Sequence, residues 1–166
     1  MPAASGWHWN MPSSPPSDHK LDARLRLIVE SYRRLTGKVL IPAVSADNAA
    51  LRNALWNAQR AIVAHGIEGD PIFFYGNLLA LELFEFSFEE FVRLPSRLSA
   101  EPLAQEARVR LLQQVAQQGY VDGYSGMRIA KCGRRFMIRE ATVWNLLDEH
   151  GIYFGQAAVF DQQMAF

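Results

Sequence analysis

Acidic side chains gather on both sides of Ser87, where paired carboxylates could in principle perform acid–base chemistry. Glu82 and Glu85 are spaced as neighbours on one helix face, and Glu89 and Glu90 follow closely. Glu90 stands three residues after Ser87, the spacing of a capping box in which the glutamate binds the backbone at a helix start. We therefore interpret this stretch as a solvated helix face. The chain also lacks a G-x-S-x-G nucleophile motif and a phosphate-binding loop, so we expect no enzymatic activity.

Basic side chains gather on one predicted hairpin, with the single cysteine, Cys132, at its tip. They are Arg128, Lys131, Arg134, Arg135 and Arg139. Nearby cations favour the thiolate form of a cysteine. Four interpretations stay open: a redox-sensing thiol, a basic patch for an acidic protein partner, nucleic-acid binding through this one hairpin, which we favour least, and ordinary surface charge, which we favour most.

The charge balance of the whole chain restricts its partners. Seventeen Lys and Arg residues match seventeen Asp and Glu residues, which gives a net charge of zero. Binding to phosphate groups requires a basic surplus or a basic stripe, so we expect no nucleic-acid partner and no attraction to an anionic membrane.

The histidines do not form a metal site in the sequence. His65 precedes a glycine at the end of a predicted strand, with no second histidine or carboxylate at metal-ligand spacing. We expect a hydrogen-bonded structural histidine there, in preference to a proton sensor or a metal ligand. His8, His19 and His150 stand in the predicted arm, a helix start and a turn, where they would be solvated.

The N-terminal part of the chain divides into an arm and a helical extension. Residues 1–17 are rich in Pro, Ser and Gly and predict a flexible arm, although Trp7 and Trp9 interrupt it. Residues 18–58 predict two helices. The first has apolar residues at intervals of four, three, four and three from Leu21 to Leu35.

Residues 59–166 predict one domain of mixed helices and strands. A hairpin surrounds the turn-rich "HGIEGDP", a short helix and a capped second helix follow, and Pro102 begins a longer helix that ends at Gly119. Phe86 and Phe91 have the spacing of a hydrophobic staple around the capping box. After Gly119 the apolar period drops to two, which predicts three antiparallel strands.

Both faces of the middle strand of these three are apolar. Strict alternation places Phe136, Ile138, Thr142, Trp144 and Leu146 on one face, and Met137, Ala141, Val143 and Leu147 on the other. Both faces must then be covered. The central helices would cover one, and either the amphipathic N-terminal helix or a second copy of the chain would cover the other.

Length and cysteine usage favour a small cytoplasmic protein. A chain of 166 residues has the common size of one domain, and its single cysteine excludes an internal disulfide. The N-terminus lacks the basic and apolar regions of a signal peptide, and no apolar run is long enough to span a membrane.

Six motifs resemble the MEKHLA family, a group with a PAS-like fold. They are "ALELFE" (80–85), "LPSRLSAEP" (94–102), "YSGMRI" (124–129), "GRRF" (133–136), "ATVWNLLDEHG" (141–151) and "GQAAVF" (155–160). The family includes stand-alone bacterial proteins and the C-terminal part of class III homeodomain–leucine-zipper transcription factors. The resemblance implies an α+β fold with a five-stranded antiparallel PAS-like sheet, helices packed on one face, and here an N-terminal helical extension.

The resemblance also implies a small apolar cavity, since PAS relatives bind flavin, haem or metabolites between sheet and helices. The cysteine of photoactive flavin domains is absent from "GNLLALELF", and the long helix offers no histidine for haem, so we predict no known cofactor. Aromatic and amide side chains suit an unidentified small organic ligand. The candidate ligand-binding residues are Phe73, Tyr75, Asn77, Leu81, Trp144 and Gln156. The alternative is a filled core without a ligand, in which Asn77 only caps the following helix.

The sequence thus predicts a non-enzymatic sensory or regulatory module that binds a small molecule in an apolar cavity. The alternative is a protein–protein interaction module, a homodimer or the binder of another protein, without a ligand.

Overall fold

The computed structural model describes residues 14–42 and 47–161, apart from the side chains of residues 102 and 103. Most of the predicted arm over residues 1–17, including both of its tryptophans and His8, lies outside the described residues.

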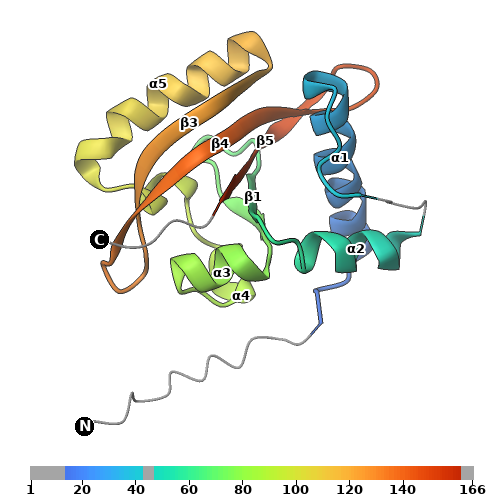
Figure 1. The fold of residues 1–166 in the computed structure, drawn as a ribbon, viewed down its shortest axis with the longest axis horizontal. Coiled ribbons are helices and arrows are strands. Elements are labelled where there is room, and N and C mark those ends of the chain that lie inside the picture. The colour runs from blue at the N-terminus through green and yellow to red at the C-terminus, as the bar shows by residue number, and fades with distance from the viewer. Residues whose placement is uncertain (1–13, 43–46, 162–166) are drawn as a thin grey trace, which may run out of the picture.

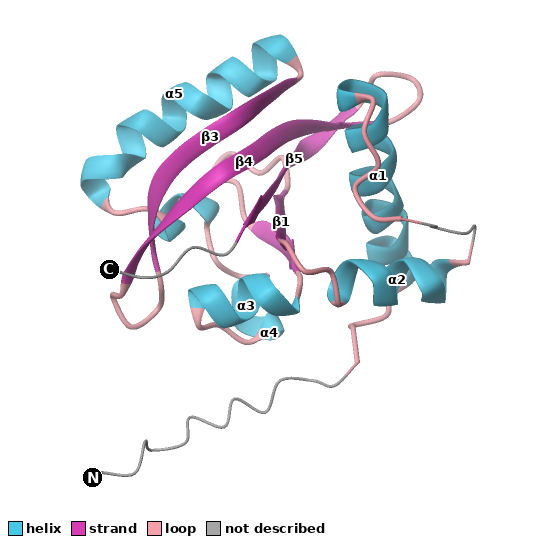
Figure 2. Ribbon diagram, in the orientation of Figure 1, coloured by secondary structure: helices cyan, strands magenta, loops and turns pink. Residues whose placement is uncertain are grey.

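A five-stranded antiparallel sheet forms the centre of the molecule (Figures 1 and 2). Its strands are β1 (Ala61–His65), β2 (Phe73–Gly76), β3 (Tyr120–Ile129), β4 (Arg135–Leu147) and β5 (Tyr153–Asp161). The spatial order is β2-β1-β5-β4-β3, so the N-terminal hairpin joins the C-terminal strands through the β1–β5 pair. The predicted hairpin and three C-terminal strands are confirmed.

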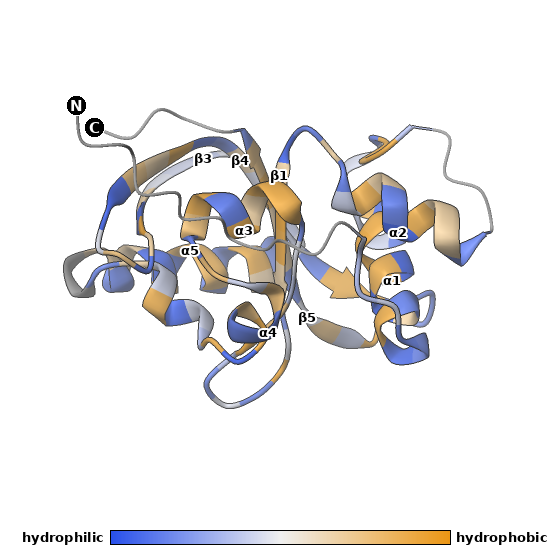
Figure 3. Cartoon of the chain, turned by 90° about the horizontal axis from the view of Figure 1, so that it is seen from below, coloured by the Kyte–Doolittle hydropathy of each residue, from blue (hydrophilic) through white to orange (hydrophobic). Residues whose placement is uncertain are grey.

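Helices cover both faces of the sheet (Figure 3). One face carries α3 (Leu78–Phe84), α4 (Phe88–Phe91), the 3-10 helix η1 (Ser96–Ser99) and α5 (Pro102–Gln118). The other face carries α1 (His19–Thr36) and α2 (Asn48–Trp56), which form the predicted N-terminal extension. The apolar face that was left open to a second copy of the chain is therefore covered by the chain itself.

A β-bulge in β4 overturns the predicted alternation of that strand. Glu140 has a left-handed backbone (φ 52°), and the pairing with β5 shifts by one residue between Arg139 and Thr142. One extra residue exchanges the faces of all residues that follow it. Phe136 and Ile138 consequently lie with Ala141 and Val143 on the α3–α5 side, whereas Trp144 and Leu146 lie under α1 and α2. The prediction that Phe136 and Ile138 share a face with Trp144 was wrong.

The restart of the helix at Ser87 follows the predicted capping box. The Ser87 hydroxyl accepts a hydrogen bond from the backbone N–H of Glu90, and the Glu90 carboxylate accepts one from the backbone N–H of Ser87. The rings of Phe86 and Phe91 lie 6.2 Å apart, as expected for the staple. The capping box and the staple are confirmed, and they fix the angle between α3 and α4.

Asn77 joins three elements below the sheet. Its Oδ1 accepts hydrogen bonds from the backbone N–H groups of Ile62 and Ala80, at 3.0 and 3.1 Å. Its Nδ2 donates to the carbonyl oxygens of Leu55 and Arg60, at 3.1 and 2.9 Å. The side chain is fully buried, so these four bonds replace all of its contacts with water. Asn77 therefore holds the end of α2, the start of β1 and the N-terminus of α3 together.

Asn77→Ala should lower the free energy of unfolding by about 3 kcal/mol or more, because it leaves several buried backbone groups without partners. Asn53→Ala, on the exposed side of α2, is the matched control and should change stability by less than about 0.5 kcal/mol. Urea unfolding measures both. An equal effect of the two substitutions would contradict this role of Asn77.

Candidate functional site

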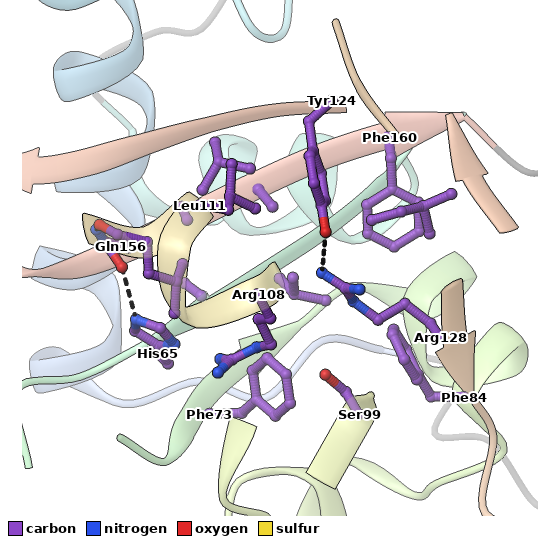
Figure 4. Close-up of a pocket in the computed structure, with 17 residues that line it drawn as sticks. His65, Phe73, Phe84, Ser99, Arg108, Leu111, Tyr124, Arg128, Gln156 and Phe160 are labelled. Carbon is purple, nitrogen blue, oxygen red and sulfur yellow. Dashed lines mark hydrogen bonds between the residues drawn. The ribbon is translucent and has the colours of Figure 1, made fainter. Parts of the chain in front are cut away.

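A cavity of about 60 Å³ lies between α5 and the concave face of the sheet (Figure 4). Residues from all five strands and from α3, η1 and α5 line it. Its apolar walls include Phe73, Phe84, Leu111, Ile138, Val143 and Phe160, and its polar groups are His65, Ser99, Arg108, Tyr124, Arg128 and Gln156. The bulge in β4 contributes directly, because it brings Ile138 and Val143 onto the same face of the sheet.

One end of the cavity is closed by a chain of buried hydrogen bonds centred on His65. Its Nδ1 lies 2.8 Å from the Ser96 hydroxyl, and its Nε2 lies 3.2 Å from Oε1 of Gln156. The Gln156 amide donates to Asn145 Oδ1 at 3.2 Å and to the carbonyl oxygen of Leu112 in α5 at 3.1 Å. The chain thus ties β1, η1, β4 and β5 to the long helix.

The donors and acceptors in this chain fit a neutral His65. The Gln156 oxygen can only accept, so Nε2 carries the ring proton and Nδ1 accepts from the Ser96 hydroxyl. Burial, followed by the positive charge of Arg108, lowers the pKa of His65 to about 4. The ring is therefore uncharged at neutral pH.

Close approach of β5 to β1 at His65 depends on Gly155. Its φ is +131°, and a Cβ there would lie 2.0 Å from the carbonyl oxygen of His65. No other residue would fit without separating the two strands, so the glycine sets the position of Gln156 against the histidine.

Two buried arginines point into the cavity from opposite elements. Arg108 in α5 and Arg128 in β3 are each only 8% exposed. Arg108 donates to the Ser96 hydroxyl at 2.6 Å, and Arg128 donates to its neighbour's carbonyl oxygen, at Met127, at 2.8 Å. Burial and the charge of Arg128 lower the pKa of Arg108 to about 10. With this pKa Arg108 stays charged at neutral pH, and both side chains are largely shielded from solvent.

Tyr124, Gly126 and Arg128 form a row on the cavity face of β3. Their partners on β4 are Ala141, Ile138 and Phe136, which belong to the same side of the sheet. A Cβ at Gly126 would lie 2.4 Å from the Tyr124 hydroxyl and 3.1 Å from the Arg128 guanidinium. The glycine leaves the room in which the Arg128 guanidinium donates to the Tyr124 hydroxyl at 3.4 Å.

The structure divides the six predicted ligand-binding residues into two groups. Phe73 and Gln156 line the cavity. Asn77 and Leu81 do not line it: Asn77 uses its side chain to connect α2, β1 and α3, and Leu81, within α3, is fully buried in the core. Ligand binding by any of these residues stays a prediction.

Tyr75 and Trp144 lie on the opposite face of the sheet, in the core under α1 and α2. Trp144 is there because the bulge in β4 reverses the alternation before it, and its ring contacts Tyr32 of α1 at 4.9 Å. The Tyr75 hydroxyl and the Trp144 indole nitrogen are buried without a hydrogen-bond partner among the described residues. Neither side chain reaches the cavity described above.

Sequence reasoning missed Arg108, Arg128, Tyr124 and Ser99 as cavity residues. Arg128 was grouped with the basic hairpin, but its side chain is buried beneath the sheet. The period-two row of Tyr124, Gly126 and Arg128 within "YSGMRI" was a usable signal, because it places all three on one face of a strand. Arg108 is spaced three and seven residues before Leu111 and Val115, so it lies on the same face of the long helix. Because that face is buried, the spacing also predicts burial of Arg108.

Three of the four remaining cations of the basic hairpin contact the helical layer. Lys131 pairs with Glu90, Arg135 pairs with Glu101, and Arg134 donates to the carbonyl oxygen of Leu83 at 2.7 Å. Cys132 is exposed at the tip. This arrangement fits the favoured interpretation of surface charge, and these cations also attach the hairpin to α3 and α4. The redox role of Cys132 stays a prediction.

Residues 14–42 and 47–161 contain neither a metal-binding cluster nor a membrane-spanning helix. No group of three or more His, Cys, Asp or Glu side chains in these ranges could hold a metal ion. No helix in the same ranges is long and apolar enough to cross a bilayer.

His65 should make stability depend on pH between about 6.5 and 4. The unfolded chain binds the proton near pH 6.5, while the folded chain resists it until about pH 4. Above about pH 6.5, His65 is neutral in both the folded and the unfolded chain. As the pH decreases from about 6.5 to 4, the free energy of unfolding should fall by about 3 kcal/mol. Urea unfolding across this range should show the decrease in the wild type and a flatter curve for His65→Gln. The exposed His150→Gln is the control and should keep the wild-type slope; a His65→Gln slope equal to the wild type would contradict the assignment.

Comparisons with known proteins agree with this geometry. The "MEKHLA domain" family model matches residues 22–164. Curated relatives include the homeobox-leucine zipper protein HOX10 of Oryza sativa, 28% identical over 125 residues, and ATHB-14 of Arabidopsis thaliana, 27% identical over 144 residues. These alignments cover 75% and 83% of this chain, but the chain spans only 15% and 16% of those proteins.

Solved PAS-type structures share the fold. The PAS domain of a protein from Colwellia psychrerythraea superposes with a TM-score of 0.59 at 20% identity, over 67% of this chain and 92% of that chain. A light-oxygen-voltage domain, studied with a flavin analogue, gives a TM-score of 0.58 at 19% identity, over 69% and 85%. The cavity here is far smaller than the roughly 300–1,000 Å³ of typical cofactor and drug sites, so its residues do not fit a flavin. The predicted PAS-like fold is confirmed, and the match over residues 22–164 shows that the chain belongs to the MEKHLA domain family.

Proposed function

We propose that this chain is a sensory or regulatory module that binds a small molecule in the cavity between α5 and the sheet. The observation that carries the proposal is the cavity itself, which combines apolar walls with convergent polar side chains at a few fixed positions. Membership of a PAS-like family supports it, because this fold places a cavity between its helices and its sheet.

The chemistry around the cavity favours binding over turnover. Ser96 and His65 are in hydrogen-bond contact, as a nucleophile and its base would be. However, the Ser96 hydroxyl is fully buried and accepts from Arg108, and the third member of the chain is the neutral Gln156. We propose that the group has a structural role and that the module is not an enzyme.

The same hydrogen bonds offer a route from the cavity to the outer helix. Gln156 lines the cavity and binds the backbone of α5 at Leu112, and Asn145 binds it again at Val115, 3.1 Å away in both cases. A ligand that displaces Gln156 would loosen two attachments of α5 to the sheet. We propose that the position of α5 is the output of the module.

A substitution that fills the cavity should remove a bound molecule. Ala158 lines the cavity from β5, and Ala158→Leu would place a larger side chain there. Native mass spectrometry of the purified protein should show a bound small molecule in the wild type and its loss in this variant. Ala54→Leu is the control, since Ala54 lines a separate groove beside α2 and should leave binding unchanged.

Two results would contradict this function. One is a wild-type protein that carries no small molecule and gains none from a cell extract. The other is loss of the molecule in Ala54→Leu but not in Ala158→Leu, which would place the site in the groove beside α2.

A second candidate function, self-association, is favoured by exposed apolar side chains at one end of the sheet. Ile67, Ile152, Tyr153 and Phe154 are 65%, 55%, 42% and 42% exposed. Ile67 lies two residues after β1 ends at His65, which pairs with Gln156 near the start of β5. Apolar groups gathered in this way are typical of interaction surfaces.

The doubly substituted chain Tyr153→Ser, Phe154→Ser should separate this function from the first. If the surface mediates dimerisation, light scattering after size exclusion should give a dimer for the wild type and a monomer for the variant, because the apolar contact area is lost. A wild type that is monomeric at all concentrations would contradict self-association and leave the cavity proposal unaffected.

A further inference from the structure

We propose that the ligand of the cavity is a small organic anion, a monocarboxylate with a short apolar tail, held between Arg108 and Arg128. This inference rests on the proposed ligand-binding function and names the class of ligand.

The two guanidinium groups have no carboxylate partner in the part of the chain that the structure describes. No Asp or Glu oxygen lies within 4.0 Å of either group. The undescribed ranges contain no Asp or Glu, so they cannot supply a side-chain carboxylate. The hydrogen bonds of Arg108 and Arg128 go to neutral acceptors, at Ser96, Met127 and Tyr124.

Nearby acidic side chains are used elsewhere. Asp70 is close enough to favour the charged form of Arg108, but it is exposed and pairs with Arg97 at 3.1 Å. Glu68 is also exposed, and its effect is on His65. Two positive charges therefore share a buried space without an ion-pair partner, and burial, followed by the charge of Arg128, lowers the pKa of Arg108. Such an arrangement is costly for a protein unless another molecule supplies the missing charge.

The remaining polar groups of the cavity complete a site for an anion. The Tyr124 hydroxyl accepts from Arg128, which leaves its own proton free for a ligand oxygen. The His65 ring is neutral and fully used by Ser96 and Gln156, so it adds neither repulsion nor a competing charge. Figure 4 shows Arg128 entering from β3 below Tyr124, and Arg108 entering from α5 beside Phe73.

The size and the walls of the cavity narrow the class of anion. A water molecule needs at least about 10–15 Å³ of such space, so 60 Å³ holds roughly four to six water-sized groups. The walls of the cavity also include apolar side chains such as Phe84, Ile138 and Phe160. Inorganic phosphate would leave these walls without contacts, whereas a short-chain carboxylate places its planar head against the guanidinium groups and its tail against the walls.

The test compares butyrate, its neutral amide butyramide, and inorganic phosphate as probes of the full chain. Calorimetric titration and thermal unfolding should both detect butyrate, with a melting temperature that rises with butyrate concentration. Butyramide has nearly the same shape without the charge and should bind about tenfold or more weakly. Equal binding of butyrate and butyramide, or binding of phosphate without butyrate, would overturn the inference.

Substitution of the arginines tests the assignment of the site. Arg108→Met and Arg128→Met should each weaken butyrate binding about tenfold or more, because a charged partner is lost. Arg110→Met is the control on the same helix, since the Arg110 side chain is 70% exposed. Arg128→Met should also melt no lower than the wild type without ligand, because it removes an unpaired buried charge. Unchanged butyrate affinity in both cavity variants would overturn the assignment, and if a variant fails to fold, the comparison of butyrate with butyramide still decides.

Failure of this inference is distinguishable from failure of the proposed function. If butyrate does not bind but native mass spectrometry finds a neutral molecule that Ala158→Leu removes, the cavity function stands and the anion class is wrong. If no probe and no cellular molecule binds, both are wrong.

Discussion

The hydrogen-bond chain from Arg108 through Ser96 and His65 to Gln156 is the constraint on which the architecture of the cavity depends. It joins the consecutive elements η1 and α5 to β1 and β5, which lie far from them in the sequence. With a neutral imidazole and its proton on Nε2, His65 accepts from Ser96 and donates to Gln156, and burial favours that neutral state. The long helix is thus held over the sheet by directional polar contacts, and it leaves a space that apolar packing alone would tend to close.

The two buried charges make this arrangement energetically costly. Arg108 and Arg128 are both buried, and the hydrogen bonds they make go to neutral oxygens. A fold optimised only for stability would replace them with apolar side chains of similar volume. Their presence is understandable if binding of an anion compensates the charge, so that stability, ligand occupancy and the position of α5 become linked.

The sequence predicted the elements of the fold well and the site only in part. Periodicity, the capping box at Ser87 and the six family motifs were sufficient for the strands, the helices and the PAS-like arrangement. The bulge at Glu140 was not predicted from alternation, because β4 is apolar on both faces before Arg139 and after Glu140. That one inserted residue moved Trp144 away from the cavity and Val143 into it. Arg128 was predicted on the exposed hairpin, because charged residues are usually exposed to solvent. Only its alternation with Tyr124 and Gly126 on one face of the strand could have indicated burial.

The central claim is that an anion binds between the two buried guanidinium groups, and nuclear magnetic resonance of the arginine side chains tests it most directly. In a butyrate titration of the ¹⁵N-labelled protein, the Nε–H signals of Arg108 and Arg128 should shift together and saturate, while that of the exposed Arg110 stays in place. Shifts confined to surface arginines, or none at Arg108 and Arg128 when butyrate is bound, would contradict the account.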